Sequence, residues 1–155
     1  ALPGLHRPDV SGDGHHRRRL RPLGSGLSSR RAGRLQDLLP LDDRLAIVGP
    51  PQGELREAAR AGGFRYCVEG FADRGYCADG SLVPRSQAGA LLHGEAAAHQ
   101  GLALARGEAI RAVDGSALNL AIDTLCVHGD GAEAVALARA LRRAIESAGL
   151  TVCAP

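Results

Sequence analysis

From Leu45 onward, short apolar runs alternate with alanine-rich runs, and this alternation limits the fold more than any other feature of the sequence. The apolar runs predict strands over residues 45–49, 65–68, 124–128 and 150–153. The alanine-rich runs predict helices over residues 54–61, 93–106 and 133–148, and a glycine follows each of them, as is common where helices end. Strands that alternate with helices predict an α/β fold with a parallel sheet.

One further segment, AIRAVDGSALNL at residues 109–120, departs from this alternation. Its apolar and polar residues alternate on both sides of Asp114-Gly115, a dipeptide preferred in the tight turns of β-hairpins. The sequence therefore predicts an antiparallel hairpin ahead of the strand at residues 124–128.

Residues 1–44 differ in composition from the rest of the chain. They carry nine arginines against five acidic residues, whereas residues 45–155 carry ten arginines against twelve acidic residues. A segment rich in Gly, Pro, Ser and Arg, without an apolar period, cannot bury enough surface to offset the entropy lost on ordering. We therefore predict a low-complexity segment over 1–44, disordered or produced by a disrupted reading frame, and a folded part over 45–155.

The run HHRRRLR at residues 15–21 is the most basic stretch of this segment. Such a run occurs in patches that bind nucleic acid or an anionic surface, and it occurs more often in a solvated, disordered tail. No aromatic residue is interleaved with these arginines, so the stacking platform that single strands require is missing. The sequence favours the solvated tail, and nucleic acid is not the expected partner.

The four cysteines, Cys67, Cys77, Cys126 and Cys153, show no spacing typical of a zinc site. Three of them lie in apolar, strand-like runs, where a reduced cysteine acts as a small hydrophobe. The N-terminus lacks the apolar core of a signal peptide, and no apolar run approaches the roughly eighteen residues of a membrane span. These features predict a reduced cytoplasmic protein and leave the metal requirement open.

Chemistry is concentrated in the segment EGFADRGYCADGSLVPRSQ, residues 69–87, which shows neither a helical nor a strand period. As a loop it is long, since connections of about four to six residues are usual in compact domains. In parallel α/β folds, ligands bind on the loops at the C-terminal ends of the strands. This loop and the loop His128-Gly129-Asp130 both meet that rule.

Each of these two loops begins with an ionisable residue. Glu69 and His128 lie at the ends of predicted neighbouring strands, so they are candidates for a general acid/base pair. Asp130 either orients His128 or caps the following helix. Asp73 and Arg74 form either a functional pair or an ion pair that only braces the loop.

Arg85 and Ser86 follow a Val-Pro dipeptide within the longer loop. A guanidinium at this place suits bidentate binding of a carboxylate or a phosphate. The alternative is that it satisfies carbonyl groups of the loop. In the same loop, Asp79-Gly80 predicts a tight turn.

Two long strings carry a resemblance to a known family: EGFADRGYCADGSLVPRSQAGALL at residues 69–92 and DTLCVHGDGAEAVALARALRRAIESAGL at residues 123–150. They resemble the C-terminal portion of the LamB/YcsF family, the A subunit of bacterial 5-oxoprolinase, and the resemblance extends over about Leu45–Leu150. It implies a β/α barrel of the glycoside hydrolase/deacetylase type, of which this chain holds the C-terminal half.

The resemblance also implies a function and a site. The function is ATP-dependent opening of 5-oxo-L-proline to L-glutamate, a cyclic-amide hydrolysis with ATP as cofactor and subunits B and C as partners. Among the residues on the matching motifs and beside them, we expect a catalytic group and a group that binds substrate or ATP. The catalytic candidates are Glu69, Asp73, His128 and Asp130, and the binding candidates are Arg74, Tyr76, Arg85 and Ser86.

The N-terminal motifs of the family do not occur in residues 1–44: an acidic first-strand motif, a Cys-Gly-x-His stretch and a Lys-Pro-His-Gly-Ala-Leu-Tyr stretch. We therefore expect a truncated or frame-disrupted member of the family. A competing expectation is a non-catalytic remnant that folds only with a partner or by self-association. An arginine-tail nucleic-acid binder is a third and weaker one.

Overall fold

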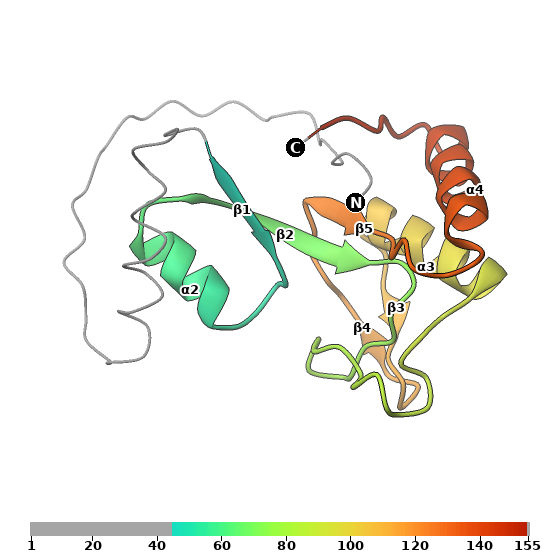
Figure 1. Cartoon of the computed structure of the whole chain (residues 1–155), viewed down its shortest axis with the longest axis horizontal. Coiled ribbons are helices and arrows are strands. Elements are labelled where there is room, and N and C mark those ends of the chain that lie inside the picture. Colours follow the sequence, from blue (N-terminus) through green and yellow to red (C-terminus); the bar gives the residue numbers. More distant parts are fainter. Residues whose placement is uncertain (1–44, 155) are drawn as a thin grey trace.

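The computed structural model of the chain describes residues 45–154, and the predictions made for residues 1–44 lie outside them (Figure 1). The elements in chain order are β1 (Ala46–Gly49), α2 (Glu54–Ala61), β2 (Arg65–Phe71), α3 (Gly94–Arg106), β3 (Ile110–Arg111), β4 (Ala117–Leu118), β5 (Thr124–Cys126) and α4 (Ala134–Ser147). None of the helices in this part of the chain is long and apolar enough to cross a membrane.

Three strands form a parallel sheet in the order β1-β2-β5. The chain passes from β1 to β2 through α2, as the crossover between parallel strands requires. β3 and β4 form a separate antiparallel hairpin around Asp114-Gly115, where Gly115 has a φ of +88°. The predicted α/β class, its parallel sheet and the hairpin are confirmed.

β2 is longer than predicted. The predicted strand ended at Val68 and placed Glu69 in the following loop, and this boundary is wrong because β2 continues to Phe71. Its last three residues pair with β5, with Glu69 opposite Thr124 and Phe71 opposite Cys126. The polar Glu69 and the small Gly70 broke the apolar run in the sequence, but the second neighbouring strand extends the ladder through them.

The predicted helices agree with the observed ones to within one residue at each end. The predicted strand over 150–153 is wrong, because Val152 is a single bridge residue and no ladder forms there. A strand requires successive ladder hydrogen bonds, which a favourable apolar composition alone does not supply. The predicted strand over 124–128 is shorter as well, so His128 lies beyond its end.

The core lies between the sheet and the helix pair α3 and α4, which Figure 1 shows side by side at one end of the molecule. Leu125 of β5 packs there with Leu104 of α3 and Leu141 of α4. Gly101 makes the close approach possible, since a Cβ there would lie 2.7 Å from Leu141 Cδ1 and 2.9 Å from Ala72 Cβ. A side chain at residue 101 would therefore push α3 away from both neighbours.

The segment after β2 is folded back on itself around Arg74, which is 7% exposed. Its Nε donates to the carbonyl of Ala90 at 3.0 Å, and its Nη2 donates to the carbonyl of Val83 at 2.8 Å. The expected turn at Asp79-Gly80 is confirmed, with Gly80 at a φ of +84°. The Asp79 carboxylate accepts the backbone N–H of Ser81 at 2.9 Å, which closes the turn.

Tyr76 is the largest side chain that this segment buries, with 1% of its surface exposed. Its hydroxyl oxygen accepts the backbone N–H of Phe71 at 2.7 Å, at the end of β2 where the ladder stops. Burial raises the pKa of Tyr76 to about 12. The ring therefore anchors the segment to the core.

Replacing Tyr76 with Phe removes this acceptor and leaves the Phe71 N–H without its partner at a part-buried place. We expect the free energy of unfolding to fall by about 1–3 kcal/mol, the usual cost of such a group, as measured by urea denaturation. Tyr66→Phe is the matched control, because the Tyr66 hydroxyl donates to the Pro50 carbonyl at an exposed place where water can replace it. Equal losses in the two variants would contradict the anchoring role of Tyr76.

Candidate functional site

The C-terminal ends of β2 and β5 bring two chemically active side chains together. Asp73 follows β2 and His128 follows β5, and His128 Nδ1 lies 3.0 Å from each carboxylate oxygen of Asp73. The backbone N–H of His128 also donates to Asp73 Oδ2 at 3.1 Å. The carboxylate thus holds both the ring and the backbone of His128.

The imidazole ring is fixed on a second side by stacking. The ring of Phe71 lies 5.6 Å from it, centroid to centroid, at an interplanar angle of 20°. Within residues 45–154, His128 makes its ring hydrogen bonds through Nδ1 alone. A carboxylate at Nδ1 favours the tautomer with the proton there, which leaves Nε2 as the basic atom.

A pocket of about 430 Å³ opens beside this pair, at the start of α4. Asp73 and His128 form part of its wall. Both of the loops on which the sequence predicted ligand binding thus contribute to this pocket. The other lining residues are Arg85, Leu91, Leu92, His93, Gly94, Asp130, Gly131, Ala132, Glu133, Ala134 and Leu137. Its place agrees with the rule that ligands bind at the C-terminal ends of parallel strands.

Arg85 and Asp130 both line this pocket and form an ion pair, with Arg85 Nη1 3.9 Å from Asp130 Oδ2. Their side chains are 53% and 74% exposed, and exposed ion pairs contribute little to stability. The guanidinium can therefore exchange Asp130 for an anionic ligand at small cost. The alternative that Asp130 caps the helix is wrong, because Glu133 is the N-cap of α4.

Glu69 lies apart from this pocket, within β2 rather than at the start of a loop. It shares a face of the sheet with Phe71 and with Cys126, since alternate residues of a strand point the same way. Burial and then the charge of Glu69 raise the pKa of the Cys126 thiol to about 11, and a hydrogen bond that the thiol donates to the Glu69 carboxylate adds to this shift. A role of Glu69 in proton transfer stays a prediction.

The remaining predicted residues divide between the fold and the surface. Arg74 is occupied by two loop carbonyls, so the loop-bracing alternative describes its contacts, although the partner is not Asp73. Tyr76 is buried in the core. Ser86 is exposed and does not line the pocket. Binding roles for these three stay predictions.

Sequence reasoning missed one residue that contacts the segment carrying Asp73. Gln100 of α3 is 7% exposed, and its Nε2 donates to the carbonyls of Phe71, Ala72 and Arg74 at 3.0, 3.2 and 2.7 Å. No motif or spacing marked it, because it lies in the middle of an alanine-rich helix. Only the packing of α3 against the end of β2 shows its contacts.

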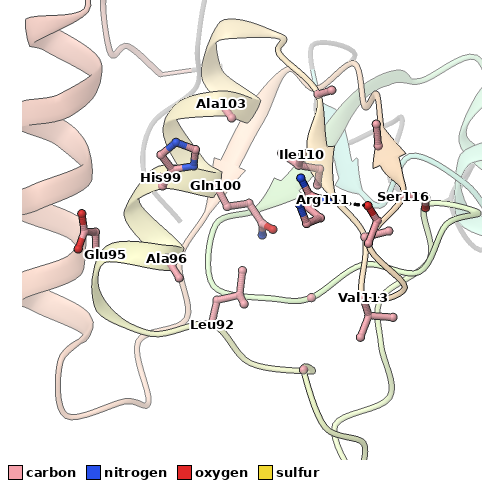
Figure 2. A pocket seen from close by; sticks show the side chains of 16 residues that line it. Leu92, Glu95, Ala96, His99, Gln100, Ala103, Ile110, Arg111, Val113 and Ser116 are labelled. Atoms are coloured by element: carbon pink, nitrogen blue, oxygen red, sulfur yellow. Dashed lines mark hydrogen bonds between the residues drawn. The ribbon is translucent and has the colours of Figure 1, made fainter.

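A larger pocket of about 890 Å³ lies between α3 and the β3–β4 hairpin (Figure 2). His99 and Gln100 border it from α3, and Arg111 and Ser116 border it from the hairpin. The Arg111 guanidinium is engaged by the carbonyl of Gly115 at 2.8 Å. This pocket lacks the Asp73–His128 pair, so we place the candidate site in the smaller one.

The part of the chain that the structure describes contains no group of three or more His, Cys, Asp or Glu side chains that could hold a metal ion. Its four cysteines are all free. The chemistry that these residues offer is therefore that of an oriented imidazole, a buried carboxylate and an exchangeable guanidinium.

Comparison with known proteins shows the family of this chain. The model of the LamB/YcsF family matches residues 32–155, which includes part of the segment before Leu45. The chain belongs to the LamB/YcsF family. The resemblance carried by the two sequence strings is thus confirmed.

Three curated relatives are each named as the A subunit of 5-oxoprolinase. The one from Nocardia farcinica is 42% identical over 118 residues, which are 76% of this chain and 47% of the relative. The one from Carboxydothermus hydrogenoformans is 50% identical over 102 residues, 66% of this chain and 40% of the relative. The one from Azorhizobium caulinodans is 42% identical over 113 residues, which are 72% of this chain and 45% of the relative. The chain spans less than half the length of these relatives.

One solved structure has a similar fold. The crystal structure of a lactam utilization protein from Thermus thermophilus superposes with a TM-score of 0.76 at 32% identity. The match covers 83% of this chain and 51% of that protein.

Removing the charge of Glu69 tests the geometry of this face of the sheet. Glu69→Gln lowers the pKa of the Cys126 thiol toward its ordinary value, so more thiolate is present at pH 8. Because one pKa unit changes the thiolate fraction tenfold, we expect alkylation of Cys126 by iodoacetamide to accelerate roughly three- to tenfold. Peptide mass spectrometry measures the rate, with Cys77 of the same chain as control. An unchanged rate at Cys126 would show that the two side chains are not in contact.

Proposed function

We propose that this chain carries part of the active site of the A subunit of a 5-oxoprolinase, which opens 5-oxo-L-proline to L-glutamate with hydrolysis of ATP. Subunits B and C are its proposed partners. The observation that supports this most is the contact of Asp73 with His128 beside a pocket at the ends of parallel strands. The names of the three curated relatives support the same reaction.

Opening a lactam requires an electrophilic carbonyl carbon, a water molecule and a proton for the leaving nitrogen. ATP, when bound, supplies the activation of the carbonyl. In our proposal His128 Nε2 takes a proton from the attacking water and returns it to the nitrogen as the C–N bond breaks. Asp73 keeps the ring in the required tautomer and stabilises the imidazolium that forms.

Arg85 is the group proposed to bind the anionic part of the substrate. It lines the same pocket as His128, and its only ion pair within residues 45–154 is the exposed one with Asp130. A guanidinium binds a carboxylate or a phosphate through two parallel hydrogen bonds, which also orients it. Asp130 then holds Arg85 over the pocket while no ligand is bound.

A second candidate is that the chain is a non-catalytic remnant that folds only with a partner or by self-association. Exposed apolar side chains at β1, the edge strand of the sheet within residues 45–154, favour this reading, since Val48 is 43% exposed and Leu45, just before the strand, is 37% exposed. An edge strand with such residues offers a surface for pairing with another chain.

Release of glutamate and ADP from 5-oxo-L-proline, with subunits B and C of a family member added, separates the two candidates. The enzyme reading predicts turnover above that of the added subunits alone, and a fall of roughly 10²–10⁴-fold in His128→Asn, the usual worth of a positioned acid or base. Turnover that does not depend on this chain would reject the proposed function in favour of the remnant.

Arg85→Lys keeps the positive charge but loses the planar fork. We expect a several-fold rise in KM for 5-oxo-L-proline or ATP and a smaller change in turnover, because the lost bonds are made in the ground state as well as in the transition state. The control is Arg106→Lys, since Arg106 makes a similar exposed ion pair with Glu108 at 3.7 Å, away from the pocket. Equal kinetics in the two variants would exclude ligand binding by Arg85.

A further inference from the structure

We propose that Gln100 is a positioning residue of this site, which acts by holding the segment Phe71–Arg74 so that the Asp73 carboxylate meets His128. The inference rests on the proposed function, because it assigns Gln100 a role in the same reaction. Gln100 lies on α3 and outside both loops in which sequence reasoning sought the site.

Phe71 is the last residue of the ladder between β2 and β5, and the backbone from there to Arg74 leaves that ladder and meets Leu91 in a single bridge at Arg74. Its four consecutive carbonyl groups nevertheless all accept a hydrogen bond. Gln100 Nε2 serves those of Phe71, Ala72 and Arg74, and the backbone N–H of Leu92 serves that of Asp73 at 2.9 Å. Because an amide nitrogen carries two hydrogens, one of them is shared between two carbonyls.

This set of bonds fixes the residue that the reaction depends on. Asp73 must hold two groups of His128 at once, its ring Nδ1 and its backbone N–H, at 3.0 and 3.1 Å. Both contacts require the Asp73 Cα to lie at one place and in one orientation. The carbonyls on either side of Asp73 are those that Gln100 binds, so its side chain replaces the missing ladder at this point.

Gln100 is itself held rigidly. Its helix is anchored in the core by Leu104, which is 2% exposed, and Gly101 allows close contact with Ala72. Figure 2 shows the Gln100 side chain reaching out from α3 beside the larger pocket. Because this buried amide is held in place by its helix, it also holds in place the backbone that it binds.

Two substitutions remove the donors at nearly constant volume. Gln100→Met removes every polar atom, and Gln100→Glu keeps the shape but turns a carboxylate toward three carbonyls. In the full chain we expect either change to shift or broaden the ring nitrogen–proton correlation of His128 in NMR spectra. The signal is assigned by its loss in His128→Asn. In the assay with subunits B and C, turnover per folded molecule should fall roughly 10–100-fold, the scale of a misplacement near 1 Å, with KM little changed.

Gln52→Met is the matched control, because Gln52 Nε2 also donates to a backbone carbonyl, that of Asp79 at 2.6 Å, at an exposed place outside the segment Phe71–Arg74. It should leave both the His128 signal and the turnover per folded molecule unchanged. An unaltered His128 signal in Gln100→Met, or the same change in Gln52→Met, would overturn the proposal. The His128 signal can be measured in a chain that has no activity. If the wild-type chain shows no turnover, the proposed function is rejected, and the signal alone still decides whether Gln100 positions Asp73.

Discussion

The parallel pairing of β2 with β5 is the constraint on which the candidate site depends. Asp73 and His128 are 55 residues apart in the sequence, and only the alignment of these two strands brings their ends together. Asp123, just before β5, fixes the register through two hydrogen bonds to Val68 of β2. Its N–H donates to the Val68 carbonyl and its carboxylate accepts the Val68 N–H, each at 2.8 Å. A shift of register would separate the imidazole from its carboxylate.

Sequence reasoning was most reliable where a local signal decided the structure. The helices, the hairpin turn at Asp114-Gly115 and the turn at Asp79-Gly80 follow from alanine content and glycine placement, and all were predicted. It also predicted ligand binding on the loops after β2 and β5, and the pocket beside Asp73 and His128 lies at these loops. The end of β2 could not be predicted, because Glu69 and Gly70 are poor strand residues that a second neighbouring strand keeps in the ladder.

Side-chain partners were predicted less well, because they depend on packing between distant segments. Asp73 was paired with its neighbour Arg74 in one reading, whereas in the structure it binds His128. Arg74 satisfies loop carbonyls, and Tyr76 is a core side chain that caps the end of β2. Nothing in the sequence marked Gln100, because a glutamine in an alanine-rich helix is common. Its contacts with the end of β2 become visible only once the helix is packed there.

A double-mutant cycle in the glutamate-release assay tests most directly whether Asp73 and His128 act as one unit. Turnover is compared for the wild type, Asp73→Asn, His128→Asn and the double variant, each normalised to folded protein. If Asp73 acts only through the ring of His128, the double variant should be no slower than His128→Asn, within about threefold. A double variant whose loss equals the product of the two single losses would contradict the account.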